Sequence, residues 1–499
     1  MELYQVPASS LDAWVAEHLQ PSEEFRQQVK DIVRRICDFL KETCFDDIKV
    51  LKTVKGGSAG KGTALKNNSD ADLVLFLDCF SSYQDQVEKR ASVLGTIEQQ
   101  LSRCQQTIAF RVDVEISQPK AKHTCPRSLS ITIQSKKRQE SIEVDVLPAY
   151  DALGHVTPGI KPSPQVYEEL IRAGAGPGDF CTSFTELQRD FVKRRPAKLK
   201  NLLRLIKHWY KELSKGMSGL PPKYALELLT IYAWEVGTES AENFSTAEGF
   251  RTVMELLRRY RELCIFWTEF YDLQSPVIGP HVKQLLRAPS PVILDPADPT
   301  GTLGQGKKWD LLAKEAAICQ AQMFCKNGLA PIRCWNVQPA RPVQVTVKQL
   351  SGVRQALRLS PYTTIWEIKE AIEREWRISP YVQRLALQEP GMGNQPLLDD
   401  QTLASYSIFY DTTILMLTTE PQEMEIFVKD QNSRTSPYAV CASDTVLGLK
   451  KKIEGRTGVT VSQQILTFNS KELQDSCMLS HYGIRNKSTV YLLLRLRGG

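Results

Sequence analysis

The stretch GGSAGKGTALKNNSDADLVLFL, residues 56–77, joins a glycine-rich turn to a pair of aspartates that opens an apolar strand. Asp70 and Asp72 follow Ser58 by twelve and fourteen residues. Residues two apart on a strand face the same side, so the two carboxylates point to one place. Two carboxylates at one place repel each other unless a cation compensates, and Mg²⁺ prefers oxygen ligands. The stretch therefore predicts a metal site at the start of a strand.

A third acid comes from IEVDVLPAY, residues 142–150. Its apolar residues alternate with Glu143 and Asp145, which places Asp145 on the polar face of a second strand. Three acids on neighbouring strands could hold two Mg²⁺ ions about 4 Å apart, the arrangement for in-line displacement at phosphorus. One ion would activate an attacking hydroxyl, and the other would neutralise a departing pyrophosphate. The alternative is that the acids are solvated side chains at the end of a strand.

The glycine-rich turn also suggests a P-loop, in which backbone N–H groups hold phosphates. It does not fit the G-x-x-x-x-G-K-[ST] template, because Lys61 precedes Gly62 and only Thr63 follows. A Gly–Ser turn followed by D-x-D resembles instead the polymerase-β-type nucleotidyltransferase superfamily. That resemblance implies nucleotidyl transfer as the chemistry of the first part of the chain.

The length of 499 residues exceeds what one hydrophobic core usually holds, so roughly two to four domains are expected. The N-terminus has no secretory signal, and no apolar run approaches the roughly 20 residues that span a bilayer. Twelve cysteines without a CxxC pair are typical of reduced thiols in a cytosolic protein. We therefore expect no membrane partner and a cytoplasmic location, with the nucleus left open as a second compartment.

The distribution of charge is more informative than the net charge of +6. Residues 189–207, RDFVKRRPAKLKNLLRLIK, hold eight Lys or Arg against one Asp. Such clustering is the electrostatic footprint expected of a site for a polyanion. The alternative is a solvated helix face, which is the usual meaning of a charge run.

Hydrophobic periodicity indicates two lobes before residue 341. Residues 1–157 are expected to form an α+β lobe, with strands at 48–54, 73–80, 128–135 and 141–150. Residues 158–340 are expected to form a mainly helical lobe, with amphipathic helices at 199–213, 224–237 and 250–270. This order favours a two-lobed enzyme.

Beyond residue 340 the chain uses one module twice. Five positions from Thr364 to Leu385 recur at a constant offset between Thr445 and Leu466. Four positions within 403–414 recur within 479–490 at a smaller constant offset. The drop in offset implies a five-residue insertion in the first copy, near residues 389–396. We place the modules at residues 341–420 and 424–499, each the size of a small domain.

Residues 1 to about 337 resemble the 2′-5′-oligoadenylate synthetases. The resemblance implies a bilobal polymerase-β-type core. It also implies that double-stranded RNA activates the chain and that the chain joins ATP units through 2′-5′ linkages, with release of pyrophosphate. Such synthesis belongs to interferon-type antiviral innate immunity. The segments that carry the resemblance are 56–77, EVDVLPAYDALG (143–154), 187–210, 221–235 and PVILDPADPTG (291–301).

The resemblance implies roles for individual residues. Asp70, Asp72 and Asp145 match the catalytic triad that holds two Mg²⁺ ions. Gly57 and Ser58 match the turn that contacts phosphate. The positions expected to bind the donor ATP are Arg204, Lys207, Tyr224 and Lys223, the last standing where some members have Gln. The positions expected to face RNA are Lys41, Lys55, Arg189 and Lys193, whereas Ala13 and Leu51 depart from the family pattern. Duplex RNA would be bound by shape and phosphate, because its deep major groove excludes side chains.

Residues 424–499 resemble ubiquitin over its whole length, down to the terminal LRLRGG, and residues 342–419 resemble it more weakly. This implies two β-grasp domains with protein partners, the architecture of the oligoadenylate synthetase-like proteins. Some of those have lost the acids and act without catalysis. This chain keeps all three acids, which favours an active enzyme. The alternative is a non-catalytic RNA-binding adaptor that acts through its ubiquitin-like tail on a cytosolic RNA sensor. We expect a monomer, because residues 324–326 read Phe-Cys-Lys where some members assemble through Cys-Phe-Lys.

Overall fold

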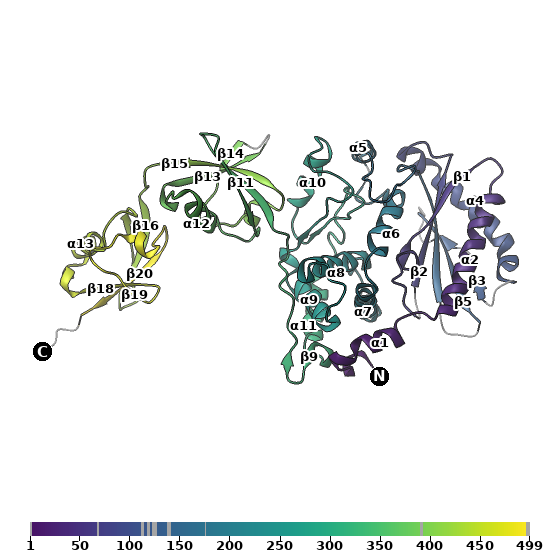
Figure 1. Cartoon of the computed structure of the whole chain (residues 1–499), viewed down its shortest axis with the longest axis horizontal. Coiled ribbons are helices and arrows are strands. Elements are labelled where there is room, and N and C mark those ends of the chain that lie inside the picture. The colour runs from purple at the N-terminus through teal and green to yellow at the C-terminus, as the bar shows by residue number, and fades with distance from the viewer. Residues whose placement is uncertain are drawn as a thin grey trace. The chain divides into compact units, whose positions relative to one another are not determined.

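The computed structural model describes the chain except Met1 and residues 67–68, 111–113, 117–119, 122–126, 137–140, 175, 390–392 and 496–499. The chain divides into two compact units, Met1–Arg341 and Pro342–Gly499 (Figure 1). The first holds the α+β and helical lobes, and the second holds the repeated modules. None of the described helices is long and apolar enough to cross a membrane.

The first lobe is a twisted mixed sheet with α2 (Glu23–Glu42) and α4 (Tyr83–Phe110) packed against it (Figure 1). β2 and β6 are parallel neighbours, whereas β1 pairs with β2 and β5 pairs with β6 in antiparallel fashion. β2 begins at Ser69, earlier than the predicted residue 73, so Asp70 and Asp72 lie within the strand. In order, the sheet contains β1 (Val50–Lys55), β2 (Ser69–Leu77), β6 (Ser141–Ala149), β5 (Leu129–Ser135) and β3 (Val114–Ile116), with β4 (Lys120–Ala121) beside β5.

Alternation along β2 and β6 decides which face of the sheet carries the acids. The apolar alternates of both strands are buried in one core with α2 and α4. Because successive side chains point to opposite faces, Asp70, Asp72 and Asp145 lie on the face away from these helices. The buried alternates are Ala71, Leu73, Leu75, Leu77, Val144 and Val146.

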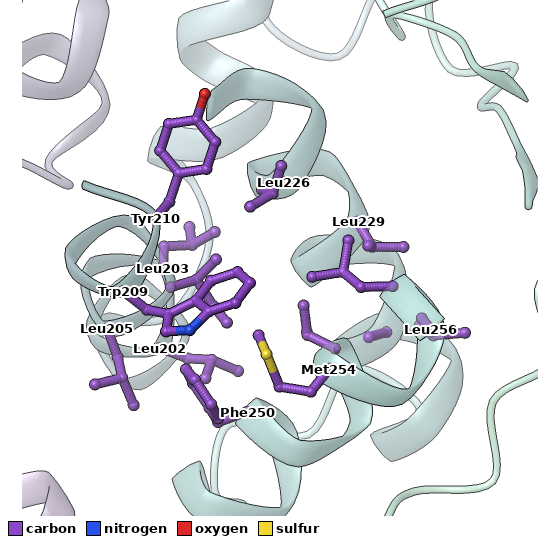
Figure 2. Close-up of a cluster of buried hydrophobic side chains, with 14 of the residues drawn as sticks. Leu202, Leu203, Leu205, Trp209, Tyr210, Leu226, Leu229, Phe250, Met254 and Leu256 are labelled. Atoms are coloured by element: carbon purple, nitrogen blue, oxygen red, sulfur yellow. The ribbon is translucent and has the colours of Figure 1, made fainter. Parts of the chain in front are cut away.

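The second lobe is a helical bundle around one large core. Figure 2 shows Leu202, Leu203 and Trp209 of α7 facing α8 and α9 across this core. The N-terminal helix α1 (Leu11–His18), which we expected in the first lobe, packs into the same core. The main helices are α5 (Pro164–Arg172), α6 (Thr185–Lys193), α7 (Ala197–Ser214), α8 (Lys223–Thr238), α9 (Thr246–Arg258), α10 (Ile278–Leu286) and α11 (Trp309–Cys319).

The prediction of one helix over residues 250–270 is wrong. Helix α9 ends at Arg258, and β7 (Cys264–Ile265) then pairs in parallel with β8 (Val292–Ile293). The flanking residues extend the pairing, because Val292 N–H donates to the Leu263 carbonyl over 2.8 Å. Strand pairing satisfies the backbone N–H and C=O groups of this buried segment. The sequence could not predict the pairing, because hydrophobic periodicity within residues 250–270 carries no information about a partner near residue 292. The loop after β8 enters the site described below.

The second unit contains two copies of one β-grasp topology, which confirms the repeat. Each has a five-stranded sheet with a parallel central pair and a helix packed on one face. The equivalent Gln383 and Gln464 are buried and make the same contacts. Each side-chain amide donates to a helix carbonyl over 3.0 Å, Lys369 or Lys450, and to a loop carbonyl over 2.8 Å. Part of the predicted insertion, residues 390–392, and the last four residues of the LRLRGG tail lie outside the described residues.

The elements of the first copy are β11 (Val343–Gln349), β12 (Arg354–Leu359), α12 (Ile365–Trp376), β13 (Gln383–Glu389), β14 (Gly393–Pro396) and β15 (Thr412–Thr418). Those of the second copy are β16 (Met424–Lys429), β17 (Thr435–Val440), α13 (Val446–Thr457), β18 (Gln464–Phe468), β19 (Lys471–Glu472) and β20 (Thr489–Leu494). The strand orders β12-β11-β15-β13-β14 and β17-β16-β20-β18-β19 are equivalent. The fold class predicted for the whole chain, an α+β core with a mainly helical second lobe followed by two β-grasp domains, is therefore confirmed.

Candidate active site

The three acids of the predicted triad meet across the parallel β2–β6 pair. The register places Asp72 directly beside Asp145 and Asp70 beside Glu143. Asp145 also accepts a hydrogen bond from the Ser130 hydroxyl over 2.5 Å. Within the described ranges, no three His, Cys, Asp or Glu side chains are grouped closely enough to hold a metal ion. The backbone therefore brings the triad to one place, while the carboxylates of this conformation do not converge on a single point.

A tight turn connects β1 to the short helix α3 (Gly57–Lys61) and lies against β2. Gly57 has φ +64°, and a Cβ there would lie 2.8 Å from the Asp72 backbone nitrogen and 2.9 Å from the Asp70 carbonyl oxygen. Ser58 Oγ accepts from the Asp70 N–H over 3.0 Å and donates to the Asp70 carbonyl over 2.9 Å. Glycine is therefore required at position 57, and the Ser58 side chain fastens the turn to the strand that carries the acids.

Positive charge keeps Asp70 ionised. Burial alone would raise its pKa, but the charge of Lys207 and the nearby Ser58 hydroxyl outweigh burial, with smaller effects from Lys223 and Lys61. Together they lower the pKa of Asp70 to about 2. A carboxylate that stays ionised among cations is suited to bind a divalent cation whose ligands must be deprotonated.

A cavity of about 390 Å³ opens beside the acids and joins the two lobes of the first unit. Its volume lies within the usual range for small-molecule sites. From the first lobe it is lined by Gly57, Ser58, Lys61, Asp70 and Asp72. From the helical lobe it is lined by Gln188, Lys207, Lys223, Tyr224 and Glu227, and by residues of the loops at 177–181 and 295–303.

An ion-pair network crosses this cavity. Glu227 of α8 binds Lys61 of α3 over 2.9 Å and Lys207 of α7 over 2.8 Å, and the most exposed of the three side chains, that of Lys61, is only 12% exposed. Burial favours the neutral forms, yet pairing lowers the pKa of Glu227 and raises that of Lys61. Lys207 also donates to the Thr63 hydroxyl over 2.9 Å. The network ties α3 to the helical lobe.

Two of the positions predicted to bind ATP line the cavity beside Lys207. Lys223 is exposed at the start of α8, and Tyr224 is half-buried next to it. Lys61 Nζ lies 4.2 Å from the centre of the Tyr224 ring, and the Tyr224 hydroxyl donates to Asp295 over 3.3 Å. The aromatic ring is thus held between α3 and the loop after β8.

Arg204 does not line this cavity. Its guanidinium donates to the carbonyls of Gly62 over 2.7 Å and Ala64 over 3.0 Å, behind the turn. Burial and the nearby charge of Arg26 lower the pKa of Arg204 to about 10. It lines a separate, mainly apolar cavity of about 240 Å³ between α2 and α3. In this conformation Arg204 supports the segment that follows α3, and its predicted contact with ATP stays a prediction.

The loop after β8 brings two further acids to the cavity. Asp295 accepts from the Gln188 amide over 2.5 Å and from the Ala297 N–H over 2.8 Å. Burial, reinforced by the charge of Asp298, raises the pKa of Asp295 to about 7. Burial also raises the pKa of Asp298. Both carboxyl groups thus lie in a site where a negative charge is costly.

The four positions predicted to face RNA lie on the first lobe and on α6. Lys41 is exposed in the last turn of α2, and Lys193 is exposed at the end of α6. A Cβ on Gly60 would lie 2.4 Å from the Lys55 carbonyl oxygen and 3.6 Å from the Arg189 Cδ, so these two residues flank α3. The charges of Lys55 and Lys41 both act on the buried thiol of Cys37, whose pKa burial raises. Lys55 and Arg189 therefore lie next to α3, the helix that begins at Gly57.

Sequence reasoning did not assign Lys61, Glu227, Asp295 or Asp298 to the site. Lys61 appears within GGSAGKG, where it served only to reject a P-loop. Glu227 is a single acid within the apolar run of α8, a pattern that indicates a buried partner. The two aspartates belong to PVILDPADPTG, whose Asp-Pro pairs give no chemical assignment without the fold.

Family models match most of the chain. The model described as 2′-5′-oligoadenylate synthetase 1, domain 2, C-terminus matches residues 160–340, and a nucleotidyltransferase domain model matches residues 36–150. A ubiquitin-like domain model matches residues 342–433, and a ubiquitin family model matches residues 426–497.

Two similar proteins align with almost the whole chain, and a third aligns with its first two thirds. The chain is 44% identical to 2′-5′-oligoadenylate synthase-like protein 2 of Mus musculus, over 99% of this chain and 98% of that protein. It is 41% identical to 2′-5′-oligoadenylate synthase-like protein 1 of Rattus norvegicus, over 100% and 98%. It is 51% identical to 2′-5′-oligoadenylate synthase 3 of Rattus norvegicus, over 68% of this chain and 30% of that protein. The chain therefore belongs to the 2′-5′-oligoadenylate synthase-like proteins, with a nucleotidyltransferase core and two C-terminal ubiquitin-like domains.

Proposed function

We propose that this chain is a double-stranded-RNA-activated enzyme that joins ATP units into 2′-5′-linked oligoadenylates and releases pyrophosphate. Its setting would be interferon-type antiviral innate immunity, in the cytoplasm, as a monomer. The observation that carries the proposal is the register that sets Asp72 beside Asp145, on the face of the sheet next to the Gly57–Ser58 turn. Supporting it are the cations that line the adjacent cavity and the relatives named as oligoadenylate synthases.

Asp70, Asp72 and Asp145 are the residues that would hold two Mg²⁺ ions. Carboxylate oxygens are the donors that this cation prefers, and the depressed pKa of Asp70 keeps that ligand ionised. When bound, the ions supply charge neutralisation for the triphosphate and a lower pKa for the attacking hydroxyl. Ser58 holds the Asp70 backbone through both of its hydrogen bonds, so the turn and the first ligand move together.

The cations of the cavity would bind the triphosphate of the donor ATP. Lys207 is positioned by Glu227 and by the Thr63 hydroxyl. Lys223 is exposed at the N-terminal end of α8. Fixed positive charges in a partly buried site stabilise phosphate charge more strongly than charges in water do. Tyr224 would offer an aromatic surface next to these cations.

RNA activation would act through the segment that joins Lys55 to the phosphate turn. The backbone N–H of Gly56, the next residue, donates to the Asp72 carbonyl over 2.6 Å. A phosphate contact at Lys55 is therefore one residue away from a hydrogen bond to the acid-bearing strand. We infer that RNA selects a conformation in which Asp145 leaves Ser130 and joins Asp70 and Asp72, a coupling of two sites through one element. Identical acid geometry in structures with and without RNA would contradict this coupling.

The decisive experiment measures pyrophosphate release from ATP and Mg²⁺ with and without duplex RNA, followed by linkage analysis of the product. Asp145→Asn should abolish release while leaving the melting temperature close to that of the wild type. Asp78→Asn is the matched control. It changes an acid just past the far end of β2, and Asn can still accept the 2.8 Å hydrogen bond from the Lys49 N–H. No RNA-dependent release by the wild-type chain would refute the synthetase proposal.

A second candidate is favoured by the separate compact unit formed by the two ubiquitin-like domains. In this alternative the chain is an adaptor that binds RNA and acts through its tail on a cytosolic RNA sensor, without catalysis. Asp72→Ala should abolish synthesis and leave the adaptor function intact. A chain that ends at Arg341 should keep synthesis and lose the adaptor function. Antiviral protection measured in cells that express each variant distinguishes the two functions.

A further inference from the structure

The first unit contains a second cavity, of about 240 Å³, between α2 and α3. We call it the α2–α3 cavity. Among the residues that the structure describes, only Asp72 lines both this cavity and the candidate active site. Helix α3 lies between the two spaces, because Ala59 and Gly60 line the α2–α3 cavity, whereas Ser58 and Lys61 line the active site. The α2–α3 cavity is therefore a separate space with a lining of its own.

Apolar side chains of α2 and β2 form much of the lining of the α2–α3 cavity. A dry apolar cavity of about 150 Å³ accommodates one benzene ring. The α2–α3 cavity, at about 240 Å³, therefore has room for an alkyl chain of roughly eight to ten carbons. It is smaller than the roughly 300 Å³ at which sites for drug-sized ligands begin, which argues against a nucleotide. The apolar side chains are Phe25, Val29 and Val33 of α2 and Ala71 and Leu73 of β2.

Four cations line the same cavity. Arg26 and Lys30 lie one turn apart on α2 and are exposed, whereas Arg204 of α7 is buried. The fourth cation is Lys55, at the end of β1. Asp72 is the one carboxylate among the described lining residues. An apolar space lined by four cations and one acid complements an occupant with an alkyl body and a single negative charge.

The buried cation Arg204 donates to neutral acceptors. It is 7% exposed, and its guanidinium donates to the carbonyls of Gly62 and Ala64 and to the side-chain oxygen of Asn201. No acid among these acceptors balances its charge, and the bonds use three of its five N–H donors. A buried charge without an opposite charge is costly, and burial together with the charge of Arg26 lowers the pKa of Arg204 to about 10. An anion near these two cations would supply the missing negative charge.

We propose that the α2–α3 cavity binds a straight-chain monocarboxylate of about eight to ten carbons. Its alkyl chain packs against Phe25, Val29 and Leu73, and its carboxylate accepts hydrogen bonds from Arg26 and Arg204. Burial of the chain supplies most of the affinity, and the charge selects the acid over neutral molecules of the same length. The proposal goes beyond the proposed function and does not depend on it, because binding is measured without turnover.

Calorimetry of the full-length chain tests the site with three probes. These are octanoate, the shorter hexanoate, and octan-1-ol, which has the chain length of octanoate but no charge. Each buried methylene group contributes about fourfold in affinity, so hexanoate should bind about fifteenfold more weakly than octanoate. Octan-1-ol should bind about ten- to a hundredfold more weakly than octanoate, because it cannot form charge-assisted hydrogen bonds with the arginines.

A cavity-filling variant locates the binding. Val29→Trp occupies the α2–α3 cavity from α2 and should abolish binding of octanoate and of octan-1-ol. The matched control is Val87→Trp, which makes the same change at an exposed position of α4 and should leave both affinities unchanged.

A charge variant on the surface keeps the test informative if Val29→Trp does not fold. Arg26→Gln with Lys30→Gln should weaken octanoate binding about tenfold and leave the affinity for octan-1-ol unchanged. The matched control is Arg34→Gln, because this exposed cation of α2 pairs with Asp31 and does not line the cavity. It should leave octanoate binding unchanged.

No binding of octanoate to the wild type, or equal affinities for octanoate and octan-1-ol, would overturn the proposal. An unchanged octanoate affinity in folded Val29→Trp or in the double variant would overturn it as well, since the acid would then bind elsewhere. So would a loss in Arg34→Gln equal to that in the double variant. Pyrophosphate release is measured separately, and a chain that binds octanoate in this cavity but releases no pyrophosphate refutes only the synthetase proposal.

Discussion

Replacing Glu227 by Gln tests whether the buried ion-pair network stabilises the core. Glu227 is held by Lys61 at 2.9 Å and Lys207 at 2.8 Å, and its side chain is 6% exposed. The substitution keeps the shape but leaves two buried ammonium groups facing a neutral amide. Removing one partner of a buried pair costs about 3–5 kcal/mol. We expect the free energy of unfolding of the first unit to fall by that amount.

Calorimetry of the full-length chain measures this effect. The chain forms two compact units, so the transition of residues 342–499 serves as an internal reference. The transition of the first unit should fall by roughly 5 °C or more. The matched control is Glu212→Gln, because Glu212 forms an exposed pair with Lys215 at 2.7 Å. Exposed pairs contribute about 0–1 kcal/mol, so the control should shift the transition by about 1 °C at most.

A second substitution separates the ion pair from other effects of the change. In Glu227→Gln the cost comes from unpaired cations, so adding Lys61→Met should recover part of the lost stability. A double-mutant cycle on these two residues should give a coupling energy of about 1–3 kcal/mol. Equal shifts for Glu227→Gln and Glu212→Gln, or a coupling energy of zero, would refute this account of the network.

Three further predictions concern the turn, the buried acid and the RNA-facing cations. Gly57→Ala should reduce both stability and pyrophosphate release far more than Gly62→Ala. Both residues have positive φ, but a Cβ at Gly57 meets β2 backbone at 2.8 Å whereas one at Gly62 meets only a side chain at 3.7 Å; equal losses would contradict the clash. Burial raises the pKa of Asp295 to about 7, so the folded chain keeps a proton that the unfolded chain releases near pH 4. Stability should therefore fall as pH rises from about 4 to about 7, and Asp295→Asn should remove that slope; melting temperatures with the same slope in both proteins would contradict it. Arg189→Glu with Lys193→Glu should weaken binding of duplex RNA and reduce the log–log salt slope by about two, and an unchanged slope would exclude both residues from the RNA contact.

Local periodicity made much of the fold predictable. Alternation in β2 and β6 placed the acids on the polar face, and the structure confirms that their apolar neighbours pack on α2 and α4. The constant offsets between matching positions predicted one module used twice, and the buried Gln383 and Gln464 make equivalent contacts in the two copies. These features follow from the sequence because each depends on the spacing of residues along one element or on repetition.

The remaining features of the site arise from contacts between segments far apart in the chain. The register of Asp72 with Asp145, the position of Arg204 behind the turn, and the end of α9 at Arg258 each depend on a partner in a distant segment. No spacing within one element specifies such a partner.

The sequence by itself therefore determined which residues carry the acids, the turn and the repeated modules, because side-chain periodicity and composition are properties of a single segment. Only the tertiary structure decided that Glu227 joins two lysines and that the loop after β8 brings Asp295 and Asp298 to the cavity. The physical reason is that burial and pairing of charge depend on how the two lobes of the first unit pack together.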